Sequence, residues 1–88
     1  MEFEIMFKTA YDILKKEGFE GIYLARETDS MIVFYGGDPD IRFYGLRTVF
    51  VDKKTGEGGW FDINHRRDEM TGSKNVEIPK EYKFKKSS

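Results

Sequence analysis

The pattern of apolar residues near the start of the chain predicts an amphipathic helix over residues 3–17. Apolar side chains recur there every three or four positions, which places them on one stripe of a helix. The stripe comprises Phe3, Met6, Phe7, Ala10, Ile13 and Leu14. Gly18 follows and is expected to end the helix, because glycine readily takes the left-handed conformation found at helix C-termini.

The apolar pattern after Gly18 is that of strands. Runs of β-branched and aromatic residues alternate with turn-forming Gly, Pro, Asp and Ser residues, which is typical of antiparallel sheets. Strands are expected at residues 21–28, 30–36, 42–52, 58–64 and 75–79, with a short helical turn at residues 66–70. The connections are too short to hold crossover helices, so consecutive strands should pair antiparallel. The predicted fold is therefore α+β, with one N-terminal amphipathic helix packed on a four- to five-stranded antiparallel meander sheet.

With 88 residues, the chain is expected to form a single domain. We assign residues 1–80 to this domain and residues 81–88 to a basic C-terminal tail. The tail holds three lysines and one glutamate, and such a run at a terminus is typically frayed and solvated.

The predicted sheet is apolar on both of its faces. The second strand alternates between two apolar sets, which are Met31, Val33 and Tyr35 on one face and Ile32 and Phe34 on the other. One helix can cover only one face, and the free face of an antiparallel sheet is normally polar. We therefore expect the second face to be covered by the C-terminal segment around Tyr82 and Phe84, by a second subunit or by a partner protein. An exposed aromatic face that binds a ligand is the remaining alternative.

A lysine- and glycine-rich stretch, VFVDKKTGEGGWF at residues 49–61, resembles a phosphate-binding or calcium-binding loop only at first sight. A phosphate loop requires Gly-Lys-Ser/Thr leading from a strand into a helix, whereas Lys54 and Thr55 precede Gly56 and a strand follows. A calcium loop requires oxygen ligands at alternate positions, and Lys54 occupies one of them. The stretch instead predicts a hairpin in which Asp52 opens the turn and Gly56 supplies a positive φ.

Composition excludes several classes of protein. The chain has no cysteine, so neither a disulfide framework nor a thiolate metal site is available. The start of the chain lacks the features of a signal peptide, and the longest apolar run, residues 31–35, is far too short to span a bilayer. We expect a cytoplasmic protein of bacterial type that does not enter the membrane.

The net charge of −1 argues against a protein that binds nucleic acid through its charge. Weak binding of single-stranded nucleic acid is therefore kept only as an alternative.

Candidate catalytic chemistry is sparse. Asp38 and Asp40 flank Pro39, and His65 is the single histidine. A small-ligand or metal-dependent site built from these three side chains is one alternative, because carboxylates and imidazole bind metals and transfer protons. No serine lies in a nucleophile-elbow motif. We therefore predict a protein without enzymatic activity and without a cofactor.

The hairpin VFVDKKTGE, the aromatic strand GGWFDI after it and the late segment VEIPKEY resemble features of small bacterial domains. In PepSY-like domains and in some toxin-immunity proteins, a helix precedes an antiparallel meander with such a hairpin. The resemblance covers roughly residues 43–82. It implies a non-enzymatic module that works by binding another protein, and it carries no catalytic residues.

The leading hypothesis is a small protein-binding module, such as an immunity or regulatory protein, that acts through an aromatic sheet face or edge. Its partner is expected to be a second copy of the chain, forming a homodimer, or another protein. The residues proposed for the interaction are Tyr35, Phe43, Arg47 and Trp60.

Overall fold

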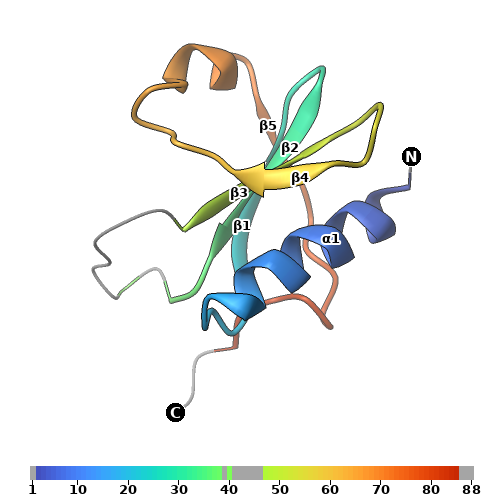
Figure 1. Ribbon diagram of the computed structural model, residues 1–88, viewed down its shortest axis with the longest axis vertical. Coiled ribbons are helices and arrows are strands. Elements are labelled where there is room, and N and C mark those ends of the chain that lie inside the picture. The colour runs from blue at the N-terminus through green and yellow to red at the C-terminus, as the bar shows by residue number, and fades with distance from the viewer. Residues whose placement is uncertain (1, 39, 41–46, 86–88) are drawn as a thin grey trace.

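The computed structural model describes residues 2–38, 40 and 47–85 and has the predicted α+β architecture (Figure 1). A single helix precedes five strands, and a short 3-10 helix separates the last two strands. The elements are α1 (Phe3–Lys16), β1 (Ile22–Glu27), β2 (Met31–Gly36), β3 (Thr48–Asp52), β4 (Gly58–Trp60), η1 (Arg67–Met70) and β5 (Lys74–Asn75). The strands form one antiparallel sheet in the order β4-β3-β2-β1-β5.

Helix α1 ends as the sequence predicts. Gly18 has a φ of 90°, and its N–H donates to the carbonyl of Lys15 at 3.0 Å. The N–H of Phe19 donates to the carbonyl of Leu14 at 3.1 Å. These two bonds form a Schellman motif, which satisfies carbonyl groups that would otherwise lack partners at the end of the helix.

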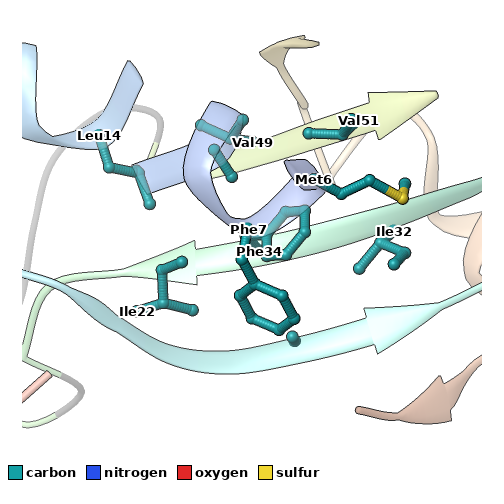
Figure 2. Close-up of a cluster of buried hydrophobic side chains, with 10 residues drawn as sticks. Met6, Phe7, Leu14, Ile22, Ile32, Phe34, Val49 and Val51 are labelled. Atoms are coloured by element: carbon teal, nitrogen blue, oxygen red, sulfur yellow. The ribbon is translucent and has the colours of Figure 1, made fainter. Parts of the chain in front are cut away.

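The main hydrophobic core lies between α1 and one face of the sheet. The helix contributes Met6, Phe7, Ala10 and Leu14, all essentially inaccessible to solvent. They meet side chains from the three central strands, namely Ile22, Ala25, Ile32, Phe34, Val49 and Val51. Figure 2 shows this cluster, in which the rings of Phe7 and Phe34 meet edge to face with centroids 4.9 Å apart. The predicted stripe of the helix is thus its buried face, except for exposed Phe3 and half-buried Ile13.

The second face of the sheet carries a separate, smaller core. Met31, Val33 and Phe61 are buried there, with Tyr35, Phe50, Ile63 and Met70 packed around them. The cover is the chain between β4 and β5, which turns back beneath the sheet after Trp60. Two hydrogen bonds fix this turn, because the Phe61 N–H donates to the Thr48 carbonyl at 2.9 Å and the Thr48 hydroxyl donates to the Phe61 carbonyl.

The C-terminal segment lies on the helix side of the sheet, so it does not provide the cover of the second face that was one of the alternatives considered from the sequence. The ring of Tyr82 stacks on Phe7 with centroids 6.1 Å apart and packs against Tyr11 at 5.4 Å. Ile22 donates to the carbonyl of Tyr82 at 2.8 Å and accepts from the N–H of Phe84 at 2.9 Å. Residues 81–85 are therefore held against the domain, which differs from the frayed tail that the run of lysines suggested.

The stretch that resembled a phosphate loop is a hairpin tip, as predicted. Gly56 has a φ of 75°, and its N–H donates to the carbonyl of Asp52 at 2.9 Å. The carboxylate of Asp52 accepts the N–H groups of Lys54 and Thr55 at 2.7 and 3.0 Å. These bonds fix the turn that joins β3 to β4. The polar residues of the stretch therefore determine which residues of the two strands pair with each other.

Candidate functional site

A depression of about 210 Å³ lies at one end of the second sheet face. We call it the tyrosine depression. Its walls are Tyr23, Tyr35, Arg47, Thr48, Asp62, Ile63 and Asn64. They come from β1, β2, the start of β3 and the segment that follows β4, so the sheet and its cover meet at this point.

A β-bulge brings Tyr23 into the depression. The pairing of β1 with β2 shifts by one residue between Ile22 and Leu24, which leaves Tyr23 as the extra residue. A bulge redirects the side chains that precede it. Ile22 therefore joins the core beneath the helix, while the ring of Tyr23 packs on Tyr35 with centroids 5.9 Å apart. Simple alternation along β1 would put Tyr23 on the same face as Ala25, and the bulge inverts this.

Arg47 completes the aromatic side of the depression. Its guanidinium lies over the ring of Tyr23, 5.2 Å from the ring centre, and donates to the carbonyl of Asp38 at 3.3 Å. The pKa of the Tyr35 hydroxyl is raised, first by burial and then by its neighbour Tyr23, while Arg26 acts in the opposite direction. Tyr35 is therefore neutral at physiological pH and can both donate and accept a hydrogen bond.

Asp62 adds a carboxylate to the lining of the depression. The carboxylate of Asp62 lies 2.6 Å from Nδ1 of His65 and accepts the N–H of Asn64 at 3.1 Å. The hydrogen bond with the His65 ring is the main cause that lowers the pKa of Asp62. The depression is therefore lined both by the carboxylate of Asp62 and by the guanidinium of Arg47.

Arg66 holds the segment that contributes Asp62 to the depression. Its guanidinium lies 4.5 Å from the ring centre of Phe61 and 5.3 Å from that of Phe50. It also binds the carboxylate of Glu69 through two bonds of 2.5 and 2.8 Å. This pairing raises the pKa of Arg66 and lowers that of Glu69. The cation packs against the aromatic layer below it, so the segment is anchored to the sheet by more than its apolar residues.

The structure brings together two of the four residues that the sequence suggested for an interaction. Tyr35 and Arg47 share the tyrosine depression. Trp60 packs against the core on the helix side of the sheet, so it belongs to a different surface. Phe43 lies outside the residues that the structure describes.

The alternative site at Asp38, Asp40 and His65 is not assembled among the described residues. The carboxylate of Asp38 accepts the N–H of Asp40 at 2.9 Å, which closes a local turn. The imidazole of His65 binds Asp62 and its side chain is 83% exposed. Within residues 2–38, 40 and 47–85, no three histidine, cysteine, aspartate or glutamate side chains lie together in a way that could hold a metal ion.

Reasoning from the sequence missed Tyr23 and Asp62 as members of the site. Tyr23 reaches it only through the bulge, and no residue of β1 marks that irregularity. Asp62 has no signal in the sequence beyond its position three residues before His65. Asp62 and Asn64 interrupt the apolar run that begins at Trp60, which is a signal for the end of a strand.

Comparison with known proteins does not add to this description, since no family model, curated protein or solved structure matches the chain. In the described part of the chain, no helix has the length and apolar character needed to cross a membrane.

Proposed function

We propose that this protein is a non-enzymatic protein-binding module whose tyrosine depression receives one side chain of a partner protein. The observation that carries the proposal is the convergence of Tyr23, Tyr35 and Arg47 on one concave surface. Tyrosine and arginine are the residue types that most often dominate the binding energy of protein interfaces. They offer large contact areas and hydrogen bonds while losing little conformational entropy, because these rings are already packed.

The size of the depression favours a side chain over a free metabolite. Pockets that enclose small molecules and cofactors usually measure about 300–1,000 Å³, whereas this one measures about 210 Å³. A single large side chain fits such a volume. Its backbone would remain outside, where the rest of the partner could contact the surrounding surface.

The charges indicate which side chain fits best. Asp62 contributes a carboxylate that accepts hydrogen bonds, and the rings of Tyr23 and Tyr35 supply apolar contact. A flat side chain with an N–H donor at its tip, such as arginine, would pack on a ring and donate to Asp62. Arg47 is already engaged with the Asp38 carbonyl, so we assign to it the orientation of Tyr23. A role in immunity or regulation is consistent with this mode of action and stays part of the proposal.

The proposal is tested by capturing partners from cells of the source organism with the purified chain, followed by affinity measurements on each purified partner. Arg47→Ala and Tyr35→Ala are compared with Arg67→Ala, which removes an exposed arginine outside the depression. We expect the affinity for a true partner to fall by about tenfold or more in the first two variants, as for central interface residues, and to be unchanged in the third. Equal affinity of all variants, or no partner with measurable affinity, would overturn the proposal.

A further inference from the structure

The outer edge of β4 presents peptide groups that point away from the sheet. The backbone N–H of Asp52 donates to the carbonyl of Glu57, and the backbone N–H of Phe61 donates to the carbonyl of Thr48, each at 2.9 Å. In an antiparallel ladder such hydrogen-bonded pairs alternate with non-hydrogen-bonded ones. The pairing of Val51 with Gly58 and of Val49 with Trp60 is therefore of the second kind, so the N–H and C=O groups of Gly58 and Trp60 face outward.

The opposite edge of the sheet, at β1 and β5, is protected from pairing with another chain, whereas the edge at β4 is not. The free edge of β1 is occupied by β5 and by further bonds, in which Val76 donates to the Ala25 carbonyl and Phe84 to the Ile22 carbonyl, both at 2.9 Å. The outermost strand there, β5, has two residues, and one of them is Lys74. Short and charged edge strands resist pairing with other chains. Strand β4 consists of Gly-Gly-Trp and carries no charge, so only its shortness limits such pairing.

We propose that β4 pairs with β4 of a second copy of this chain, antiparallel and centred on Gly59, to join two five-stranded sheets into one. In this register Gly58 lies opposite Trp60 of the second copy, and the outward N–H and C=O groups of these residues exchange hydrogen bonds. Gly59 lies on the two-fold axis in a non-hydrogen-bonded pair, where the Cα atoms approach to about 4.5 Å. The edge is therefore complementary to itself, as an interface with two-fold symmetry requires.

The position of α1 makes the second copy a suitable occupant. The helix lies over β3 and β4, and its flank reaches the edge, because a Cβ at Gly58 would lie 2.9 Å from Ile13 and 3.1 Å from Thr9. In the joined sheet, the flanks of two such helices related by the axis would face each other on the same side of the sheet. Ile5 precedes Thr9 by one turn on the same flank and is 53% exposed, so the contact would cover it.

The area available sets the strength of the association. A standard interface removes about 800 Å² from each partner, and a three-residue edge with one helix flank provides less than that. We therefore expect a weak dimer with a Kd between about 10 μM and 1 mM. This inference does not rest on the tyrosine depression, which lies on the other face and remains accessible in the dimer.

Because the chain contains no cysteine, a single introduced cysteine can report the register directly. Gly59→Cys places two thiols across the axis at a Cα distance that a disulfide accepts, whereas Lys54→Cys places a thiol at the exposed hairpin tip. In a glutathione redox buffer we expect Gly59→Cys to form a covalent dimer at least about tenfold faster than Lys54→Cys, since pairing raises the effective thiol concentration. Any side chain at position 59 brings a Cβ to 3.3 Å from the ring of Phe50. Gly59→Ala therefore serves as the control for the effect of that contact on folding.

Sedimentation of the unmodified chain provides the second measurement. We expect the weight-average mass to rise between 10 μM and 1 mM, to rise likewise for Gly59→Ala, and to stay monomeric for Gly59→Lys, which brings like charges together across the axis. Three results would overturn the proposal. They are equal cross-linking rates for Gly59→Cys and Lys54→Cys, a monomer at 1 mM, and dimerisation that Gly59→Lys leaves intact.

Discussion

Replacement of Phe61 by alanine is the sharpest test of the second core. The side chain is completely buried, meets the ring of Phe50 with centroids 6.3 Å apart, and lies under the guanidinium of Arg66 at 4.5 Å. Deleting a buried phenylalanine ring typically costs about 3–5 kcal/mol, through lost transfer free energy and the cavity that remains. At about 0.05–0.15 kcal/mol per residue, a domain of this size has a total stability of roughly 4–13 kcal/mol. We therefore expect Phe61→Ala to lose a large part of the stability of the domain.

Thermal unfolding followed by circular dichroism measures this effect. One kcal/mol corresponds to a shift in Tm of about 4–8 °C for a domain of this length, so Phe61→Ala should lower the Tm by at least about 12 °C. Phe61→Leu keeps most of the volume and should cost about 1 kcal/mol. Phe3→Ala removes a phenylalanine that is 44% exposed and should change the free energy of unfolding by less than about 0.5 kcal/mol.

The outcome also decides whether the chain after β4 belongs to the folded unit. If Phe61→Ala lowers the free energy of unfolding by less than about 1 kcal/mol, residues 61–70 do not pack on the sheet as described. The walls of the tyrosine depression formed by Asp62 and Asn64 would then have no fixed position. The reasoning that leads from this surface to a binding function would fail with them.

Three further substitutions test other parts of the fold. Gly36→Ala should lower the free energy of unfolding by about 1–3 kcal/mol, because its Cβ would lie 2.6 Å from buried Leu14; a double variant with Leu14→Ala should show smaller than additive loss in urea titrations. Gly56→Ala should cost about 1 kcal/mol in the same assay, since its φ of 75° disfavours a side chain, and an unchanged midpoint would contradict the hairpin geometry. The N–H groups of Thr55 and Lys54 lower the pKa of the Asp52 carboxylate, so this residue stabilises the fold above its unfolded pKa, about 3.9, and the contribution is lost as the pH falls through the lower folded value. Asp52→Asn should therefore flatten the decline of stability between about pH 5 and 2, and identical pH profiles would refute this assignment.

Local signals in the sequence were sufficient to predict most of the framework. The helix followed from its apolar period and Gly18, and the β3–β4 hairpin followed from Asp52 and Gly56, because these features act within a few residues. The predicted fourth strand extended to Asn64, but β4 ends at Trp60. An apolar residue at position 61 fits both a longer strand and a chain that turns onto the second face of the sheet. The hydrogen bonds between Phe61 and Thr48, which show the turn, are not visible in the sequence.

The candidate site was less accessible to such reasoning, because it depends on contacts between distant segments. Tyr35 and Arg47 were identified as aromatic and basic residues on the sheet, and the structure places them in one depression. Trp60 was grouped with them by residue type, although alternation along β4 puts it on the helix side. The bulge at Tyr23 results from the register between two strands, so it has no signature in either strand alone.

The stacking of Tyr82 on Phe7 has a consequence for how the chain reaches its fold during synthesis. The helix is translated before the strands, yet one side of its apolar surface is covered by Tyr82, which is translated after all of them. Until these residues leave the ribosome, the rings of Phe7 and Tyr11 stay without that cover. Contacts between segments so far apart in the sequence also slow folding, because the intervening chain must be ordered first. The helix can thus form early, but its packing is completed only after nearly all the described chain has been translated.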